Sequence, residues 1–384
     1  MRVAFYAPLK PPNHPVPSGD RRMARAFVRL LESLGHEVEL VSRFRSYDRT
    51  GNPTRQQRLL VLGQRLAARL VRRFAAHPPD LWFTYHLYHK APDHLGPAVA
   101  TRLGIPYIAA EASLARRRAQ GSWAVGYAAG LHALELADLV LAMTSIDQKG
   151  LRSALPASRL MHFPPFLETS AHVAARSARD QHRARLATAH GLDPDRPWLL
   201  TVAMMRPDVK RESYRLLAEA LRQAGSTPWH LLVAGDGDAK AEIASWLRPL
   251  GDRVRLLGPV AEPDLPPLYA ACDLYVWPAV AEAYGMAMLE AQAAGLPVLA
   301  GREGGVADIV ADGTTGRLVP SHDTAAFAAA LVELLGQPEL LRRWGDAASA
   351  RVEARHAWPA ARERLAGAIL RARTNHRERA CVSA

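Results

Sequence analysis

The chain has 384 residues, of which 49% are hydrophobic and 22% charged, with a net charge of +12 and two cysteines. This length predicts roughly two domains, and this composition excludes an intrinsically disordered chain. Cys272 and Cys381 are too few for a disulfide framework or a four-ligand zinc site, which favours a reducing cytoplasm.

Neither of two apolar segments has the pattern of a targeting or membrane-spanning segment. The first, residues 1–8, is shorter than the apolar core and cleavage region of a signal peptide and indicates a strand. The second, residues 127–143, carries His132, Glu135 and Asp138, which are costly inside a bilayer. We therefore expect a cytoplasmic protein without a transmembrane helix, and we leave open peripheral contact with the inner face of the membrane.

The first half alternates short β-rich runs with helical patterns, as parallel α/β units do. Residues 3–7 form the first predicted strand, a helix follows over 21–34, and residues 38–42 form the next strand. Asp20 is expected to cap this helix, and Gly35 is expected to end it in a left-handed turn. Further strands are predicted at 81–85, 107–110, 139–143 and 159–163.

The Pro164-Pro165 pair and the polar, Arg-rich segment after it interrupt this rhythm. We therefore predict an N-terminal domain at 1–165 and an interdomain linker at 166–196. A second α/β series predicts a domain over 197–355, with strands at 198–203, 230–234, 254–257, 274–277, 298–300 and 317–319. The remainder is predicted as a C-terminal helix over 356–373 and a frayed tail over 374–384.

The positive charge is concentrated in the first half. Residues 1–190 hold 27 Lys and Arg against 13 Asp and Glu, whereas the rest of the chain holds 22 against 24. Residues 43–73 hold nine arginines and one acid. The hydrophobic spacing there predicts a basic amphipathic helix with an apolar stripe of Leu59, Leu62, Leu66, Leu70 and Phe74. Its arginine face is either a solvated surface, which we favour, or a contact with anionic lipid or a lipid-linked, phosphorylated acceptor.

Two glutamates eight positions apart, Glu282 and Glu290, lie in a segment that predicts strand, loop, helix, turn and strand. If the helix begins near Tyr284 or Gly285, its first N–H groups and its dipole can bind a diphosphate, and Gly285 lets the backbone come close. Glu290 would lie just over one turn into the helix, where it can accept hydrogen bonds from a sugar diol. Spacing alone is equally compatible with two solvated acids at a helix end.

A cationic pair follows the first strand of the second domain. Arg206 and Lys210 are four positions apart and suit one diphosphate, because Arg forms forked hydrogen bonds and Lys supplies a compact charge. Such charges stabilise a leaving diphosphate, although a lone R-x-x-x-K is more often a solvated site. The G-D-G at 235–237 lacks the third glycine and the acid of a dinucleotide fingerprint, so we interpret Gly235 mainly as part of a turn.

Polar side chains also follow the strands of the first domain. Gly19 opens the first helix, where turn and capping chemistry explain it without a ligand. His86 follows one strand and Glu111 follows the next, at the strand ends where open α/β sheets place their sites. Glu111 can position or deprotonate an acceptor hydroxyl, and His86 can orient the sugar, although a histidine at a strand end is as often structural.

The run that begins E-A-Y-G-M-A-M-L-E at Glu282 resembles the E-G-F-G-x-x-x-x-E signature and sequel of glycosyltransferase family four, with Ala283 where glycine is common. The resemblance is strong over 198–320 and looser over 1–165. It implies the GT-B architecture, in which two Rossmann-like α/β domains face each other across a cleft, and we expect the C-terminal helix to pack back on the first domain. It also implies a retaining, metal-independent transferase that needs no cofactor.

The resemblance further implies a donor that is a UDP- or GDP-linked sugar. Glu282 would contact hydroxyls of its sugar, Glu290 its ribose, and the backbone from Tyr284 to Met286 its phosphates and sugar. Arg206 and Lys210 would bind the phosphates. In the family, equivalents of Gly19 lie beside the donor phosphates, and equivalents of Gly235 shape the nucleotide pocket.

The acceptor is less well defined. Many members of the family carry a histidine where this chain has Glu111, so the choice between Glu111 and His86 as the acceptor-side residue stays open. The resemblance implies an acceptor hydroxyl, and an anionic or lipid-linked acceptor in polysaccharide, glycolipid or cell-envelope glycan synthesis is left open. Arg116, Arg117 and Arg118, just after Glu111, favour an anionic acceptor.

Two other functions are weighed against glycosyl transfer. A GT-B sugar-nucleotide epimerase or hydrolase would share the second domain but use different acids, and the retained pair of Glu282 and Glu290 disfavours it. A nucleic-acid-binding protein would explain the basic first half, but its arginines lack interleaved aromatic residues and a recognisable reading motif.

Overall fold

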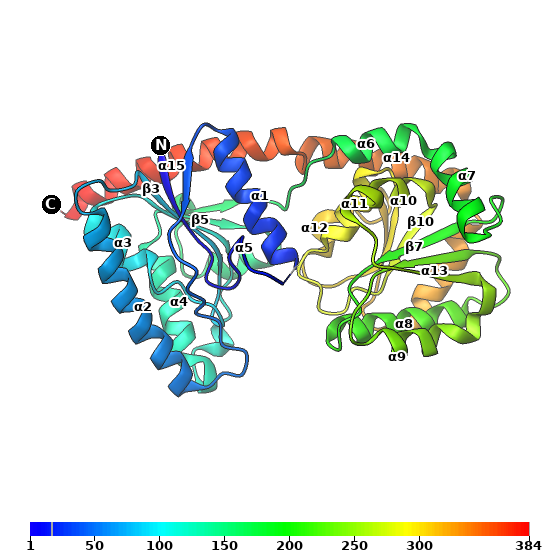
Figure 1. Ribbon diagram of the computed structural model, residues 1–384, viewed down its shortest axis with the longest axis horizontal. Helices are drawn as coiled ribbons and strands as arrows, with labels where there is room; N and C mark the ends of the chain where they lie inside the picture. The colour runs from blue at the N-terminus through cyan, green and yellow to red at the C-terminus, as the bar shows by residue number, and fades with distance from the viewer. Residues whose placement is uncertain (17, 384) are drawn as a thin grey trace. The chain divides into compact units, whose positions relative to one another are not determined.

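The structure, a computed structural model, describes residues 1–16 and 18–383, and side chains as far as residue 381. The chain divides into two compact units (Figure 1). Unit 1 comprises Met1–Pro164 together with Trp358–Ala384, and unit 2 comprises Pro165–Ala357. Each unit contains one parallel six-stranded sheet with helices on both faces, so the predicted pair of Rossmann-like α/β domains is confirmed.

The sheet of unit 1 has the strand order β2-β1-β3-β4-β5-β6. Its strands are β1 (Arg2–Tyr6), β2 (Glu37–Leu40), β3 (Leu81–Leu87), β4 (Tyr107–Ala112), β5 (Leu139–Ala142) and β6 (Leu160–His162). Its helices are α1 (Gly19–Ser33), α2 (Pro53–Phe74), α3 (Gly96–Leu103), α4 (Ala124–Leu136), α5 (Ser145–Leu151) and α15 (Trp358–Ser383). The strand order reverses between β1 and β3, and ligand sites of such sheets lie beyond the carboxyl ends of the strands at this switch point.

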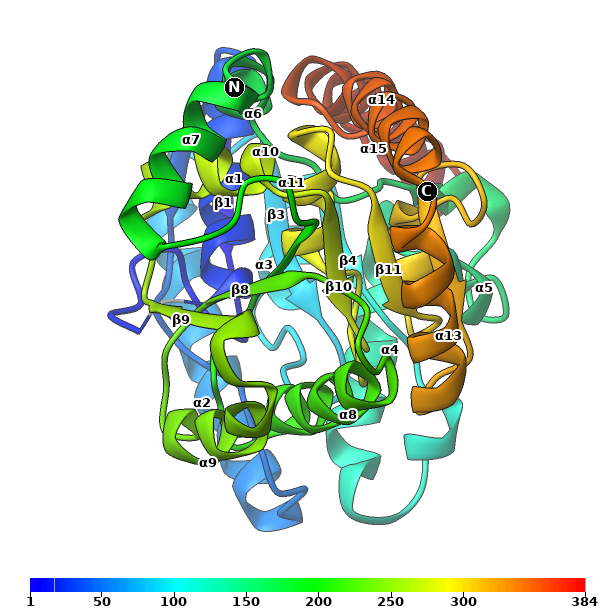
Figure 2. The same ribbon diagram turned by 90° about the vertical axis from the view of Figure 1, so that its right-hand side faces the viewer.

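The sheet of unit 2 has the order β12-β11-β10-β7-β8-β9, so its switch point lies between β7 and β10. Its strands are β7 (Trp198–Val202), β8 (His230–Ala234), β9 (Val254–Gly258), β10 (Leu274–Trp277), β11 (Val298–Gly301) and β12 (Gly316–Val319). Its helices are α6 (Ser170–Ser177), α7 (Arg179–His190), α8 (Val209–Gln223), α9 (Lys240–Leu247), α10 (Leu265–Ala271), α11 (Met286–Ala293), α12 (Val306–Ile309), α13 (Thr324–Leu335) and α14 (Pro338–Arg355). Figure 2 shows α8 and α9 on one face of the sheet and α10 and α11 on the other.

Burial on both faces explains why the inner strands of both sheets are largely apolar runs. Every residue of β5 and of β8 is buried. In unit 1 the ring of Phe27 on α1 lies 5.4 Å from those of Phe83 and Tyr85 and 5.6 Å from that of Phe163. The N-cap of α1 is Ser18, whose Oγ accepts from the N–H of Arg21. The prediction that Asp20 caps this helix is therefore wrong, and Asp20 lies in the first turn.

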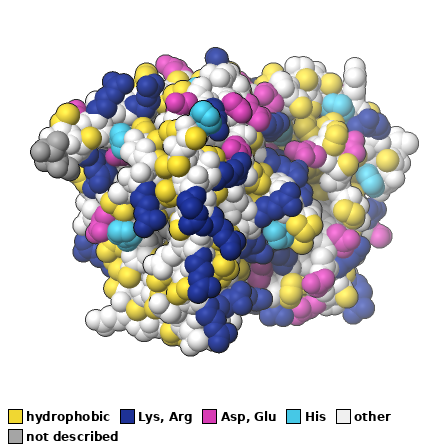
Figure 3. Space-filling model, turned by 60° about the vertical axis from the view of Figure 1, so that its left-hand side comes forward, with side chains coloured by type: hydrophobic (Ala, Val, Ile, Leu, Met, Phe, Trp, Pro, Cys, Tyr) yellow, Lys and Arg dark blue, Asp and Glu magenta, His cyan; other side chains and the backbone are white. Residues whose placement is uncertain are grey.

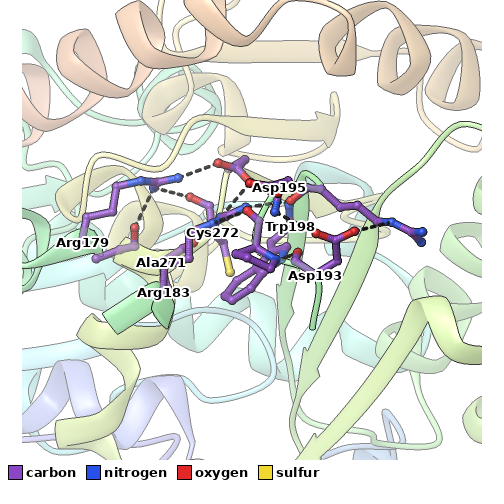
Figure 4. Close-up of polar contacts among 11 residues, drawn as sticks. Arg179, Arg183, Asp193, Asp195, Trp198, Ala271 and Cys272 are labelled. Atoms are coloured by element: carbon purple, nitrogen blue, oxygen red, sulfur yellow. Dashed lines mark hydrogen bonds and ion pairs between the residues drawn. The ribbon is translucent and has the colours of Figure 1, made fainter. Parts of the chain in front are cut away.

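The segment predicted as an interdomain linker, residues 166–196, differs in the structure, because it forms α6 and α7 and packs on α10 within unit 2. Arg179 donates to the carbonyl oxygens of Ala270, at 2.7 Å, and Cys272, at 2.6 Å (Figure 4). Arg183 donates to the Ala271 carbonyl at 2.8 Å, and its guanidinium lies 4.2 Å from the ring centroid of Trp198. The arginines that suggested a linker therefore satisfy carbonyl groups at the C-terminal end of α10.

The C-terminal helix packs back on unit 1 as predicted, but α15 continues through the segment expected to be a frayed tail. Asn375 Nδ2 donates to the Asp138 carbonyl at 2.8 Å, and His376 Nδ1 lies 3.1 Å from the Asp138 carboxylate. Arg379 lies 3.3 Å from the same carboxylate. These three contacts to one buried acid explain why the helix does not end at residue 373.

Within the described part of the chain, no single helix combines the length and apolar character needed to cross a membrane. One pair, α13 and α14, meets that test when taken together, although the two helices bend by 100° at their junction.

Candidate functional site

Apart from Gly19, which lies in unit 1, the donor-side residues predicted from the sequence gather at the switch point of unit 2. Arg206 lies in the loop after β7, and Glu282 lies in the loop after β10. The two strands are neighbours in the sheet, so both loops leave the same edge side by side. This is the edge where a doubly wound sheet binds a nucleotide.

The turn containing Gly235 fixes the loop that carries Arg206. The N–H of Ala203 donates to the Ala234 carbonyl at 3.0 Å, and the N–H of Met205 donates to the Asp236 carbonyl at 2.9 Å. A Cβ atom on Gly235 would lie 1.9 Å from the Ala203 carbonyl oxygen, so only glycine allows this approach. The turn interpretation of the G-D-G is consistent with this packing.

Lys210 and Glu282 form an ion pair that joins the two loops. Trp277, the last residue of β10, donates from Nε1 to the same Glu282 oxygen at 3.3 Å, and the Lys210 ammonium lies 5.4 Å from the Trp277 ring centroid. The Glu282 side chain is 15% exposed, which excludes the interpretation of a freely solvated acid. Arg206 is exposed at the sheet edge, and its guanidinium contacts the sulfur of Met204.

Backbone strain concentrates around Glu282. Ala279 has φ of 60° and Ala281 has φ of 49°, values that residues with a Cβ rarely adopt. Ala283 is not among the residues with positive φ, so alanine in place of the family's usual glycine costs no backbone strain. The loop is held in place by the N–H of Gly305, which donates to the Ala283 carbonyl at 2.6 Å.

The helix α11 begins at Met286, with Gly285 as its N-cap in the left-handed region, so the predicted helix start is confirmed. Glu290 lies in its second turn and is 3% exposed, which excludes the alternative of a solvated acid at a helix end. Tyr269 on α10 donates to Glu290 Oε2 at 3.0 Å. Tyr284 is buried beside the helix start.

In unit 1 the two acceptor-side candidates lie close together, with a third residue. His86 Nδ1 lies 3.3 Å from Asp20 Oδ1 and 3.5 Å from Glu111 Oε1. His86 has φ of 67° and Glu111 has φ of 50°, so both occupy strained positions near the ends of their strands. Gly19 opens α1 one residue before Asp20, and no heavy atom lies within 4 Å of the position a Cβ would take there.

The charges of this cluster are strongly coupled. Burial alone would lower the pKa of His86, but the carboxylates of Glu111 and Asp20 outweigh it and raise this pKa to about 9. Burial raises the pKa of Glu111, an effect that the charge of His86 opposes. The three ligand atoms lie within 4.8 Å of one another, close enough to hold a cation. In the structure the same three side chains form an ion-paired cluster around His86.

We expect the histidine to make folding stability depend on pH. Because the folded-state pKa lies above the usual 6.5, the protonated ring stabilises the fold fully below that pH, and this contribution is lost as the pH rises through about 9. In His86→Asn, the decline in melting temperature over this range should be smaller than in the wild type. His132→Asn, at an exposed histidine of α4, is the control, and equal declines in all three proteins would contradict the assignment.

Three contacting residues escaped the sequence analysis as site residues. Trp277 holds Glu282, Tyr269 holds Glu290, and Asp20 pairs with His86 rather than capping its helix. Trp277 directly precedes the loop after β10, which is a signal the sequence contained. Tyr269 is distant from the motif in sequence and gave no such signal.

Comparison with known proteins identifies relatives. The family described as Glycosyl transferases group 1 matches residues 196–337. Alpha-D-kanosaminyltransferase of Streptomyces kanamyceticus is 32% identical over 240 residues, which cover 62% of this chain and 61% of that protein. The D-inositol 3-phosphate glycosyltransferase of Nocardia farcinica is 36% identical, but the match covers 44% of this chain and 39% of that protein. The chain thus spans less than two thirds of these two relatives.

A longer match and two solved structures extend the comparison. Sucrose-phosphate synthase from Thermosynechococcus elongatus has a TM-score of 0.72 at 20% identity, covering 96% of this chain and 98% of that one. Anabaena Alr3699/HepE, solved in complex with UDP and glucose, has a TM-score of 0.67 at 20% identity, with coverage of 96% and 99%. Both share the fold. The D-inositol 3-phosphate glycosyltransferase of Streptomyces coelicolor is 30% identical over 321 residues, covering 75% of this chain and 68% of that protein. The chain belongs to the group 1 glycosyltransferases.

Proposed function

We propose that this chain transfers a sugar from a nucleoside-diphosphate sugar to an acceptor hydroxyl, with retention of configuration and without a metal ion or other cofactor. The observation that carries the proposal is the edge of unit 2, where Lys210 and Glu282 are paired in the segments that follow β7 and β10, and where α11 carries the buried Glu290. The relatives named as glycosyltransferases support it, and so does HepE, a protein of similar fold that binds UDP and glucose.

In this proposal the donor lies along the edge of unit 2. Arg206 and Lys210 bind the diphosphate, together with the N–H groups of residues 284–286 at the start of α11. Because Lys210 is paired with Glu282, a bound diphosphate would compete for the ammonium and release the carboxylate toward hydroxyls of the donor sugar. Glu290 accepts hydrogen bonds from the ribose. The proposal covers donors linked to UDP and donors linked to GDP.

The proposed reaction breaks the bond between the anomeric carbon and the β-phosphate oxygen and forms a bond from that carbon to the acceptor oxygen on the same face. The acceptor's proton passes to the leaving diphosphate. Catalysis then rests on orientation and on stabilisation of the leaving charge by Arg206 and Lys210. A strong protein base is not required, so Glu111 in place of the family's usual histidine is compatible with the reaction.

On the acceptor side, we propose that the cluster of Asp20, His86 and Glu111 orients the reacting hydroxyl. The basic charge of unit 1 supports an acceptor that is anionic or linked to a lipid. Two cysteines without a disulfide support a cytoplasmic location, where such an acceptor would be met at the inner face of the membrane.

Trp277 is proposed to position Glu282, and Trp277→Phe tests this role. Phenylalanine keeps a ring beside Lys210 but loses the N–H that Glu282 accepts, so we expect kcat to fall about tenfold with little change in the donor KM. Trp229→Phe is the matched control, because Trp229 is fully buried in the same unit and its indole nitrogen has no hydrogen-bond partner within the described residues. An unchanged kcat in Trp277→Phe would remove Trp277 from the site.

A panel of nucleotide sugars with mixed hydroxyl acceptors tests the function, with release of nucleoside diphosphate and a shift in melting temperature as readouts. We expect one or two donors to raise the melting temperature and to release their nucleoside diphosphate when the acceptor is present. If no donor of the panel stabilises the protein, the proposal is wrong. Tight, sequence-tolerant binding of an oligonucleotide at physiological salt would instead favour a nucleic-acid-binding protein.

A further inference from the structure

The helix α2 of unit 1 exposes apolar residues that its packing does not use. The buried residues of this helix are Gln56, Gly63, Ala67, Leu70 and Phe74. Gly63 packs closely against His94, because a Cβ atom on Gly63 would lie 2.4 Å from the Cβ of His94. The sequence predicted Leu62 on the buried stripe instead. In the structure Leu62 is 45% exposed, and Val61 beside it is 38% exposed.

A polar residue explains this displacement. Gln56, six residues before Leu62, points inward. Its Nε2 donates to the Ser122 carbonyl at 2.7 Å, and its Oε1 accepts from the N–H of Gly126 at 2.9 Å. These bonds fix the rotation of the N-terminal half of α2. Val61 and Leu62 are thereby held outward, so their exposure follows from the fold and is not a fluctuation.

Exposed arginines run along the same face as the two apolar residues. They are separated by seven, four and three residues, which keeps them on one helix face: Arg58, Arg65, Arg69 and Arg72. None of the four has an ion-pair partner within the described residues, whereas Arg73 pairs with Glu39 and Arg55 lies 3.9 Å from Asp48. From Arg58 to Arg72 this row is about 21 Å long, and α2 contains no acidic residue.

The rest of unit 1 is also positively charged. The residues of unit 1 include 29 Lys and Arg and 13 Asp and Glu, so the positive excess of the whole chain belongs to this unit. On the face shown in Figure 3, Lys and Arg side chains form a band with hydrophobic side chains beside it. A hollow of about 650 Å³ next to α2 is lined by Pro53, Val61, Leu62 and Val125, together with Arg58 and Arg65.

We propose that this face of α2, defined by Arg58, Val61, Leu62, Arg65, Arg69 and Arg72, docks on an anionic phospholipid bilayer. The sequence alone favoured a solvated arginine face. The apolar pair that the fold holds inside a row of unpaired arginines changes this preference, because an interfacial helix needs both features. The arginines attract the anionic headgroups, and Val61 and Leu62 enter the boundary between headgroups and acyl chains. The inference concerns this surface and stands independently of the proposed glycosyl transfer.

Vesicle sedimentation of the full chain tests the proposal at physiological salt. We expect the wild type to sediment with vesicles of phosphatidylcholine and phosphatidylglycerol in equal parts and to stay in solution with phosphatidylcholine alone. The double variant Arg65→Gln/Arg69→Gln should bind the anionic vesicles roughly 30-fold more weakly, because each arginine near such a surface contributes about 1 kcal/mol. Leu62→Ser should weaken binding at unchanged net charge.

Matched controls come from α15 in the same unit. Arg373→Gln/Arg377→Gln removes the same charge from exposed positions, and Leu370→Ser removes a leucine that is 65% exposed. Both should bind vesicles like the wild type, and every variant should keep the wild-type melting temperature and release of nucleoside diphosphate with a soluble acceptor. The proposal is overturned if the wild type ignores anionic vesicles, or if the α15 variants lose as much binding as the α2 variants. Failure of turnover with intact vesicle binding would count only against the proposed function.

Discussion

Lys210→Ala is expected to lower kcat/KM by about 10² to 10³-fold, the usual cost of removing one group that stabilises developing negative charge. Lys210 reaches the loop after β10, pairs with Glu282 and lies against Trp277, so its ammonium is fixed at the sheet edge before substrate arrives. A preorganised charge of this kind costs no reorganisation during the reaction. Steady-state release of nucleoside diphosphate gives the measurement.

The control for Lys210 is its neighbour on α8. Arg211 is about half exposed and pairs with Glu242 on the surface, so Arg211→Ala removes one positive charge from the same helix without touching the sheet edge. We expect its kinetics to stay within a factor of about two of the wild type, as for most exposed ion pairs. If both variants were equally mild, Lys210 would be a structural residue and the diphosphate would bind elsewhere.

The two glutamates are expected to separate binding from turnover. Glu290→Gln should weaken binding of the nucleoside diphosphate itself by about 10 to 100-fold, because a carboxylate that accepts hydrogen bonds from the ribose loses its charge. Glu282→Gln should leave that binding nearly unchanged and lower kcat, since its proposed partner is the sugar. Calorimetry with the nucleoside diphosphate and steady-state kinetics with the intact donor distinguish the two.

The shape of Glu290 is preserved in this test. Glutamine can still accept from Tyr269, so packing around this buried position should survive, and the melting temperature of Glu290→Gln without ligand reports whether it does. Equal and mild effects of both substitutions would show that these acids are parts of the fold. Such a result would not affect the family assignment, but it would mean that the donor binds elsewhere on the protein.

The sequence predicted most of the architecture because the inner strands of both sheets are buried on both faces. A strand such as β8, buried at every position, must be continuously apolar, and that pattern is visible without a structure. The start of α11 was predicted for a comparable reason, since Gly285 adopts a left-handed conformation that glycine accommodates best. Local chemistry sufficed in both cases.

The remaining features depend on partners far along the chain. In the sequence, Arg179 and Arg183 indicate a polar linker. Only the structure shows that they donate to carbonyl oxygens at the C-terminal end of α10. Leu62 fits the helical stripe by spacing, yet the bonds of Gln56 to Ser122 and Gly126 rotate it outward. No periodicity encodes these contacts.

The acceptor side shows the same division. His86 and Glu111 were found because each follows a strand, and parallel strands end at one edge of a sheet. The sequence analysis assigned the capping role to Asp20 because this residue lies at the start of a helix. In the structure Ser18, two residues earlier, is the cap. The pairing of Asp20 with His86 requires α1 and β3 to be placed together, and with Glu111 it raises the pKa of His86 to about 9.

Calorimetric titration of UDP and of GDP tests most directly whether the edge of unit 2 is a diphosphate site. The wild type is predicted to bind at least one of them, and the double variant Arg206→Ala/Lys210→Ala is predicted to bind it at least 100-fold more weakly, since two charge-assisted contacts are lost. Arg211→Ala should bind like the wild type. Equal affinity of the double variant and the wild type, or no binding of either nucleotide by the wild type, would contradict the account.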